Sequence, residues 1–340
     1  MQSKLKIERD VSLADLTTLK IGGKARLFAR AESESEVVEA FNLSNENGIE
    51  LFVLGGGSNV LIADEGFDGL VLQIGLRGIE TKENIVTAQA GEDWDEFVAF
   101  CVEKNLAGVE CLSGIPGFVG AVPVQNVGAY GQEVSETISK VRVFDRKSKE
   151  ILELNNSDCK FSYRSSLFNT TEKDRFIVLA VTFNLIENGK PKIAYKDLKD
   201  IFEGKRPNLS RTREAILQIR RAKSMVIDKN DINTNSAGSF FKNPIVERTK
   251  LAELPENIPT FNFDETNVKI PAAWLIENAG FEKGYTKNRV GLSANHTLAL
   301  INRGGATAAE ILSLKAEIKS KVKEKFGIEL VPEPVFIGFK

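Results

Sequence analysis

The chain has 340 residues, of which 45 are basic and 47 acidic, and its formal net charge is −2. Such a balance gives no broad field for nucleic acid or an anionic membrane, so neither is expected as a partner. The length allows two or three domains, each with its own core. Three widely spaced cysteines without a C-x-x-C motif, and a charged N-terminus where a signal peptide needs an apolar region, predict a cytoplasmic protein with reduced thiols.

Hydrophobic periodicity predicts an α+β fold with mixed sheets. An opening strand pair is expected within residues 11–30, and a helix is expected to begin at Ser33, because Ser33 and Glu36 have the spacing of a capping box. The next predicted elements are strands at 51–54, 70–74 and 85–88 and a helix from about 92 to 105.

The second half of the chain continues this mixture. Residues 140–146 and 151–154 predict a hairpin, and 176–186 form the most strand-like run in the sequence. A helix near 210–220 is expected to bury Ala215, Ile216 and Ile219. Two later helices are framed by terminal signals: Pro271 at N1 and Gly280 past the end of one, and the capping box Thr307–Glu310 of the other, with Ile311, Leu314, Ile318 and Val322 on its apolar face.

The stretch from Cys111 to Gly131 contains no charged residue, five glycines and two prolines. The glycines and prolines would break a membrane helix, so a buried, irregular segment is the better interpretation. Glycine backbone can approach a ligand closely, which favours the wall of a cofactor cleft. A tightly packed glycine crossing without a ligand is the alternative.

A second glycine cluster lies between two apolar strands, in LFVLGGGSNVLI at residues 51–62. It matches neither a Rossmann fingerprint nor a P-loop, since no helix follows directly and no Gly-Lys-Ser/Thr ending is present. Consecutive glycine amides can nevertheless form a nest for a diphosphate, with Ser58 and Asn59 adding side-chain hydrogen bonds. An ordinary hairpin turn is the alternative.

Together these segments resemble the UDP-N-acetylenolpyruvoylglucosamine reductase family. The resemblance continues in order through SYRSSLF (162–168), NSAGSFFKNP (235–244), AAWLIENAG (272–280) and PEPVFIG (332–338), and so covers nearly the whole chain. It implies an FAD-binding fold of the vanillyl-alcohol-oxidase/PCMH type with a C-terminal α/β substrate domain. The lobes it implies are an N-terminal lobe of residues 1–75 with 329–340, a central lobe of 76–222 and a substrate lobe of 223–328.

The resemblance implies reduction of UDP-N-acetylglucosamine enolpyruvate to UDP-N-acetylmuramate for peptidoglycan, with non-covalent FAD and with NADPH as co-substrate. No metal is expected, because His296 is the only histidine and no H-E-x-x-H motif occurs. No obligate protein partner is expected either. The cofactor-binding residues implied are Gly55, Gly56, Gly57, Ser58, Asn59, Ser113, Gly114, Ile115, Pro116, Gly117, Gly120, Asn126, Gly128, Ala129 and Tyr130.

Three residues match the family's catalytic positions. Arg164 presents a guanidinium fork suited to a carboxylate and stays charged throughout. Ser239 matches the family's proton donor to carbon, although a serine capping a turn is the alternative. Glu333 matches the catalytic glutamate, although a charge at a strand edge is the alternative. Val335 stands where many relatives have an arginine.

Tyr195, Lys223 and Asn243 are the implied substrate contacts. Tyr195 and Lys223 could instead be solvated surface residues, and Asn243 could only support its neighbours. His296 is interpreted as a structural hydrogen-bonding residue, since a strand follows it. Two other functions remain open from the sequence: a flavoprotein oxidase of the same FAD-binding superfamily, and a nucleotide-sugar-binding protein without turnover.

Overall fold

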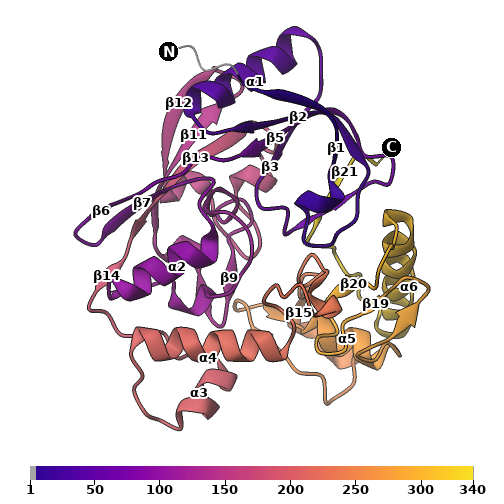
Figure 1. Cartoon of the computed structure of the whole chain (residues 1–340). Coiled ribbons are helices and arrows are strands. Elements are labelled where there is room, and N and C mark those ends of the chain that lie inside the picture. Colours follow the sequence, from indigo (N-terminus) through magenta and orange to yellow (C-terminus); the bar gives the residue numbers. More distant parts are fainter. Residues whose placement is uncertain (1–4, 340) are drawn as a thin grey trace. The chain divides into compact units, whose positions relative to one another are not determined.

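The computed structural model describes residues 5–339 (Figure 1). Residues 1–4 and 340, which belong to the predicted N-terminal lobe, lie outside the described part. The chain divides into two compact units: the first comprises the residues up to Val11, Ala25–Gly57 and Asp68–Val226, and the second Ser12–Lys24, Ser58–Phe67 and the residues from Ile227 onward. The division into three lobes stays a prediction.

The first unit is built on two sheets. In the four-stranded sheet β3 and β5 run parallel, whereas the five-stranded sheet is antiparallel throughout. The predicted strand at 176–186 is the central strand β13, which is almost wholly buried. The sheets, in strand order, are β1 (Ile7–Ser12), β2 (Lys24–Ala31), β5 (Phe67–Ile74) and β3 (Leu51–Leu54); then β12 (Glu150–Asn155), β11 (Ile138–Asp145), β13 (Phe176–Asn184), β7 (Ile85–Gln89) and β6 (Ile79–Lys82).

Helices α1 and α2 of the first unit each begin at a polar N-cap residue, and Ser33 is the one that the sequence predicted. Ser33 caps α1 (Glu34–Glu46), which lies beside β2 and β5 in Figure 1, by accepting a hydrogen bond from the Glu36 amide. Asp93 caps α2 (Trp94–Glu103), so this helix is two residues shorter at each end than predicted. The remaining helices are α3 (Lys196–Phe202) and α4 (Leu209–Ala222).

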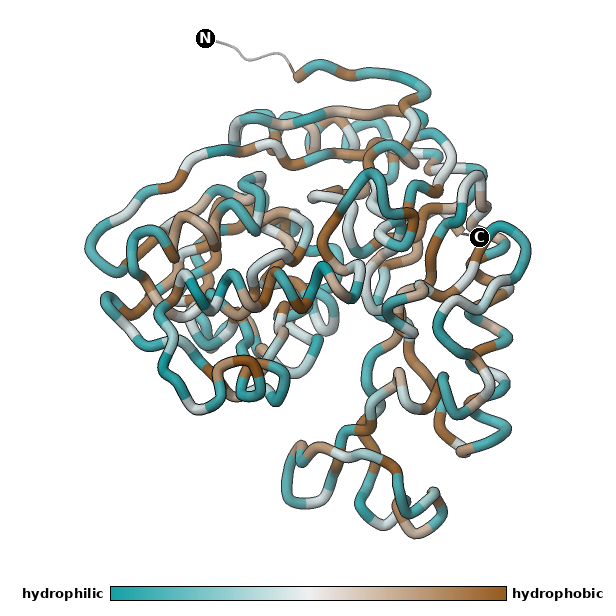
Figure 2. The backbone as a smooth tube through the Cα atoms, turned by 60° about the horizontal axis from the view of Figure 1, so that its bottom comes forward, coloured by the Kyte–Doolittle hydropathy of each residue, from teal (hydrophilic) through white to brown (hydrophobic). Residues whose placement is uncertain are grey.

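Buried apolar faces attach these helices to the rest of the first unit. Trp94 and Phe97 of α2 pack on Phe183 of β13, with ring centroids 6.0 and 4.7 Å from that of Phe183. On α4, Ala215 and Ile216 are buried as predicted. Ile219 is only half-buried, because it lies at the edge of a small apolar cluster around Cys111. Figure 2 shows the resulting alternation of hydrophilic and hydrophobic residues along the helical turns.

Up to residue 339, the second unit contains three small sheets and two helices. Its parallel pair joins a strand near residue 60 to one near the C-terminus. The strands are β4 (Val60–Ile62) and β21 (Val335–Ile337); β15 (Ile245–Glu247), β17 (Asn267–Lys269) and β16 (Phe261–Asn262); and β18 (Thr286–Lys287), β19 (Val290–Leu292) and β20 (Leu300–Asn302). Within residues 5–339, no helix combines the length and apolarity needed to cross a membrane.

The two helices of the second unit begin at or next to the residues predicted for their N-terminal ends. The capping box Thr307–Glu310 is present at α6 (Ala308–Phe326), and its predicted apolar face is fully buried. Pro271, predicted at N1 of α5 (Ala272–Asn278), is instead its N-cap, because a ψ of 115° places it outside the helix. Proline has no side-chain acceptor for the cap, and the Oδ1 atom of Asn243 supplies one by accepting from the Ala272 amide at 2.9 Å.

Several short connections complete the fold. The two-stranded pairs are β9 (Gly128–Ala129) with β10 (Gln132–Glu133) and β8 (Leu106–Ala107) with β14 (Ile186–Glu187). The 3-10 turns are η1 (Ala14–Leu16), η2 (Glu110–Leu112), η3 (Val119–Ala121), η4 (Val134–Glu136), η5 (Asn156–Cys159), η6 (Leu167–Asn169), η7 (Ile232–Thr234) and η8 (Arg248–Glu253).

An ion pair between the buried Asp145 at the end of β11 and the partly exposed Arg175 makes the stability of the fold depend on pH. Asp145 accepts two hydrogen bonds from Arg175, at 2.7 and 3.0 Å, and they hold its pKa at about 2 despite burial. The folded pKa lies below the ordinary value of 3.8, so the carboxylate stabilises the fold above about pH 4 and loses this effect as the pH falls towards 2.

We therefore expect Asp145→Asn to lower the free energy of unfolding most at neutral pH, and to differ less from the parent as the pH falls from 4 to 2. Urea unfolding at a series of pH values measures this difference. Asp68→Asn is the matched control, because the Asp68–Arg26 pair is exposed to solvent and should matter little. A difference that stays constant down to pH 2 would contradict the prediction.

Candidate active site

The two glycine loops of the sequence meet within the first unit. A Cβ atom added at Gly56 would lie 2.8 Å from the Cα of Gly117, and one at Gly55 would lie 3.6 Å from the Cβ of Ala121. Gly57, with φ of 64°, and Gly117, with φ of 124°, have backbone that side-chain-bearing residues rarely adopt. Glycine is therefore required for the loops to approach each other, and main chain is what they offer to a ligand.

The loop at Ser113 and Gly114 is fixed by the helices below it. The Gly114 amide donates to Oδ1 of Asp95 on α2 at 2.5 Å, and Arg213 on α4 binds both oxygens of the same carboxylate, at 2.5 and 2.9 Å. Burial acts to raise the pKa of Asp95, but these hydrogen bonds outweigh it and lower the pKa. The carboxylate is thus charged at neutral pH and holds the loop.

We expect Asp95→Asn to weaken FAD binding by about 5- to 100-fold, because a hydrogen bond to a charged group contributes roughly 1–3 kcal/mol. Titration of apoprotein with FAD, followed by flavin fluorescence, measures the dissociation constant. Glu34→Gln is the matched control, since it breaks a bidentate ion pair with Arg142 elsewhere in the same unit. Equal FAD affinity in Asp95→Asn and the parent would show that the loop does not need this anchor.

Arg164 lies against the hairpin of β9 and β10. Its Nη2 atom donates to the Gly128 carbonyl at 2.6 Å, and its φ of 51° places it in a tight turn closed by hydrogen bonds between Ser162 and Ser165. The Asn126 amide donates to the Ser162 carbonyl at 3.0 Å and to Glu133, so its side chain ties this turn to the hairpin. The predicted catalytic arginine and the predicted cofactor segment are therefore in contact.

Tyr195 and Lys223, the predicted substrate residues of the first unit, lie near Tyr130, a predicted cofactor residue. The rings of Tyr130 and Tyr195 meet edge to face with centroids 5.4 Å apart. Lys223 pairs with Asp197 at 2.9 Å; burial opposes its charge, but this hydrogen bond and nearby groups raise its pKa. Burial raises the pKa of Tyr130 as well, while Arg220 and Lys223 act against the rise. This cluster combines hydroxyls and fixed positive charge, the chemistry that a diphosphate requires.

The second unit places Ser239 on a segment with a partner on each side. The Phe240 amide donates to the Leu298 carbonyl at 2.8 Å, and the Phe240 carbonyl accepts from the Glu333 amide at 2.9 Å. Phe240 itself is fully buried. Ser239 and Glu333, two predicted catalytic residues, are far apart in the sequence, but the backbone segments that contain them are hydrogen-bonded to each other.

Asn59, a predicted cofactor residue, belongs to the same part of the second unit. Its Nδ2 atom donates to the Glu333 carbonyl at 3.3 Å, and its own carbonyl accepts from the Val335 amide at 3.0 Å. The parallel pairing of β4 with β21 produces this contact. Val335 is exposed at 41%. The second glycine loop therefore leads directly to the segment that carries Glu333.

The sequence interpretation missed the contact of His296 with Ser239. Its Nε2 atom lies 3.3 Å from the Oγ of Ser239, and both residues are half-buried. The two positions are separated by 57 residues, so no local pattern joins them. Among the described residues, no group of three or more His, Cys, Asp or Glu side chains could hold a metal ion.

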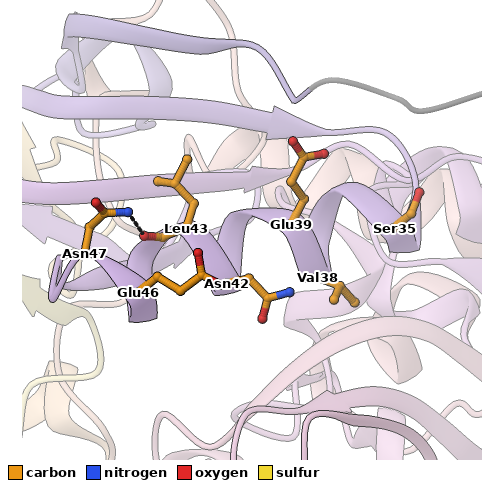
Figure 3. Close-up of a pocket in the computed structure, with 7 residues that line it drawn as sticks. All are labelled: Ser35, Val38, Glu39, Asn42, Leu43, Glu46 and Asn47. Atoms are coloured by element: carbon orange, nitrogen blue, oxygen red, sulfur yellow. Dashed lines mark hydrogen bonds between the residues drawn. The ribbon is translucent and has the colours of Figure 1, made fainter.

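A hollow on the outer side of α1 carries none of the predicted site residues. It is lined by one helical face, and the only bond drawn there is that of the Asn47 amide to the Leu43 carbonyl (Figure 3). Its polar, open lining lacks a nucleophile with a base or a cluster of cations. The predicted site residues lie instead on the glycine loops of the first unit and on the Ser239 and Glu333 segments of the second unit.

Comparison with known proteins finds a family match in the N-terminal part of the chain and another in the C-terminal part. Residues 25–155 match the family described as FAD binding domain, and residues 230–337 match the C-terminal domain of UDP-N-acetylenolpyruvoylglucosamine reductase. The UDP-N-acetylenolpyruvoylglucosamine reductase of Thermobifida fusca is 44% identical over 97% of this chain and 98% of its own length. That of Streptomyces coelicolor is also 44% identical, over 97% of this chain and 90% of its own.

A solved structure extends the similarity to the fold. The crystal structure of the Thermus caldophilus UDP-N-acetylenolpyruvylglucosamine reductase aligns with a TM-score of 0.70 at 24% identity, over 98% of this chain and all of that one. The fold and the matches define an FAD-dependent oxidoreductase. The chain belongs to the UDP-N-acetylenolpyruvoylglucosamine reductase family. The predicted family, the α+β fold with an FAD-binding domain and the cofactor FAD are thereby confirmed.

Proposed function

We propose that this chain reduces UDP-N-acetylglucosamine enolpyruvate to UDP-N-acetylmuramate with NADPH, as a step of peptidoglycan precursor synthesis in the cytoplasm. The observation that carries the proposal is 44% identity over nearly the full length of a reductase of that name, together with matches to both its domains. This identity favours reduction over the alternatives of an oxidase and a binder without turnover.

The glycine loops fit FAD held without a covalent bond. A Cβ atom at Gly56 would lie 2.8 Å from the Cα of Gly117, so glycine is what lets the two loops come this close. Consecutive glycine amides such as those of Gly55–Gly57 can form a nest for a diphosphate. Ser58 and Asn59 directly follow Gly57 and add polar groups to this loop. Bound there, FAD supplies the hydride exchange between NADPH and the substrate.

Arg164 is assigned to the carboxylate beside the enolpyruvyl double bond. Hydride addition to the double bond builds enolate character at the carbon beside this carboxylate. A guanidinium can stabilise the negative charge that develops there by two parallel hydrogen bonds to the carboxylate. Support comes from its contact with Gly128 in the predicted cofactor segment and from its half-buried position. Arginine is suited to this task because it stays charged throughout.

Ser239 is assigned as the proton donor to the enolic carbon, and Glu333 as the carboxyl group that hydrogen-bonds the forming enol or tunes the donor. A hydroxyl is a weak acid, so this transfer requires fixed geometry. The backbone that connects Phe240 with Glu333 and Leu298 supports such fixation.

Tyr195 and Lys223 are assigned to the diphosphate of the UDP group. Their cluster of hydroxyl and ammonium groups supports this assignment, as does the 40% exposure of Tyr195, which leaves its hydroxyl reachable. Asn243 is assigned as a further substrate contact. Its Oδ1 atom caps α5, which fixes the position of this side chain.

Tyr195→Phe should raise the KM for the enolpyruvyl substrate by about 5- to 20-fold, since one hydrogen bond to a charged group is lost. The rate at which NADPH reduces bound FAD should change little, because the hydroxyl has no task in that half-reaction. Steady-state kinetics and stopped-flow absorbance measure the two quantities. An unchanged KM with slow reduction by NADPH would show that the residue has another role.

The proposed function is tested with purified protein loaded with FAD. NADPH oxidation should depend on the enolpyruvyl substrate, and acid precipitation should release the yellow colour into solution. NADPH consumption that is indifferent to the substrate and requires oxygen instead would favour an oxidase. Protein that binds the UDP-sugar but cannot be loaded with FAD would favour the binder without turnover.

A further inference from the structure

The chain's only histidine lies at the residue proposed to protonate the substrate. His296 Nε2 and Ser239 Oγ are 3.3 Å apart. The backbone fixes the turn that carries His296, because the Ala299 amide donates to the His296 carbonyl at 3.0 Å. The hydrogen bond from Phe240 to Leu298 then ties this turn to the Ser239 segment. The contact is thus built by backbone on both sides.

The direction of this hydrogen bond follows from what Ser239 must do. A hydroxyl carries a single proton, and Ser239 can deliver it to carbon only if that proton points at the substrate. The same proton cannot be donated to His296 at that moment. In the productive arrangement the imidazole must therefore be the donor, with a hydrogen on Nε2 and the Ser239 oxygen as acceptor.

We propose that His296 donates its Nε2–H to Ser239 Oγ and stabilises the serinate that forms as Ser239 gives its proton to the enolic carbon. This inference rests on the proposed role of Ser239. In the step, the O–H bond of Ser239 breaks, a C–H bond forms at the carbon beside the carboxylate, and the electron pair of the broken bond stays on Oγ. His296 keeps its own proton, and the serinate regains one from solvent.

Such a hydrogen bond strengthens as charge develops on its acceptor. Bonds to charged partners are shorter and about twice as strong as neutral ones, so the contact stabilises the transition state more than the resting enzyme. His296 acts through Ser239 and is in this sense a positioning residue. It has no task while NADPH reduces bound FAD.

Nuclear magnetic resonance observes the direction of the bond in the holoenzyme, because a single histidine gives a single set of imidazole signals. With ¹⁵N-histidine labelling, the proposal predicts a proton on Nε2 and a change in that signal in Ser239→Ala. A neutral ring that carries its proton on Nδ1 alone would make His296 the acceptor and overturn the proposal.

Replacement of His296 separates its role from that of Ser239. His296→Leu should slow reoxidation of reduced FAD by substrate about 10- to 100-fold, and His296→Gln, which keeps an N–H donor near the position of Nε2, should recover most of the rate. Reduction by NADPH should stay near the parent rate in both. Thr297→Val is the control, since it disturbs the same turn without touching Ser239 and should leave reoxidation within a few-fold of the parent.

The Ser239→Ala background makes failure of the two ideas distinguishable. If the inference holds, His296→Leu adds no further loss there, because the serinate no longer forms. A parent rate in Ser239→Ala itself would remove the proposed role of Ser239. A slow Ser239→Ala beside a fast His296→Leu, equal losses in His296→Gln and His296→Leu, or an equal loss in Thr297→Val would overturn the inference about His296 alone.

Discussion

Ser239→Ala should slow the oxidation of reduced FAD by the enolpyruvyl substrate by about 10²–10⁴-fold, the usual contribution of a general acid. Reduction of bound FAD by NADPH should remain close to the parent rate, because Ser239 has no proton to deliver in that half. Stopped-flow absorbance of the flavin follows each half separately. Ser239→Cys, with a more acidic proton but a longer bond, should recover part of the rate.

A purely structural Ser239 predicts a different result. A serine that only caps a turn contributes roughly 0.5–2 kcal/mol to stability, and its loss should leave both half-reactions nearly unchanged once the protein is folded. The contact of its Oγ with His296 gives the hydroxyl a polar partner, which is compatible with either role. A Ser239→Ala enzyme that is reoxidised at the parent rate would rule out proton donation, even if its thermal stability had fallen.

Arg164→Met should lower kcat for reduction of the enolpyruvyl substrate by about 10²–10³-fold, the cost of removing one donor at a site of developing negative charge. Arg164→Lys should recover only part, because an ammonium lacks the fork that matches a carboxylate. Steady-state kinetics measures kcat, and the rate of reduction by NADPH serves as the internal control.

The contact of Arg164 with the Gly128 carbonyl supplies the competing explanation. If the guanidinium only anchors the hairpin of β9 and β10, its loss should loosen the cofactor segment and raise the dissociation constant of FAD. Fluorescence titration of apo Arg164→Met with FAD decides between the two. Weak FAD binding together with normal kcat at saturating FAD would contradict the role at the substrate carboxylate.

Local signals in the sequence determined much of the fold. Ser33 and Thr307 start helices where predicted. Each cap is a hydrogen bond from a backbone amide of the first helical turn to a side-chain oxygen three residues earlier, so it depends only on residues that are close in the sequence. The alternation in 140–154 and the apolar run at 176–186 gave the hairpin of β11 and β12 and the central strand β13, since burial of one or both faces imposes these periods. Pro271 precedes the first helical position by one residue, because its ψ of 115° lies outside the helical range.

The sequence by itself also pointed to the family and to its motifs, through residues that stand close together along the chain. Only the tertiary structure decided which motifs meet. Asn59 and Glu333 are 274 residues apart and Ser239 and His296 are 57 apart, yet each pair is in contact. Asn243 likewise caps a helix that begins 29 residues later. Periodicity and capping report neighbours within a few residues, whereas these contacts depend on strand order and on backbone pairing between distant segments, which no local pattern encodes.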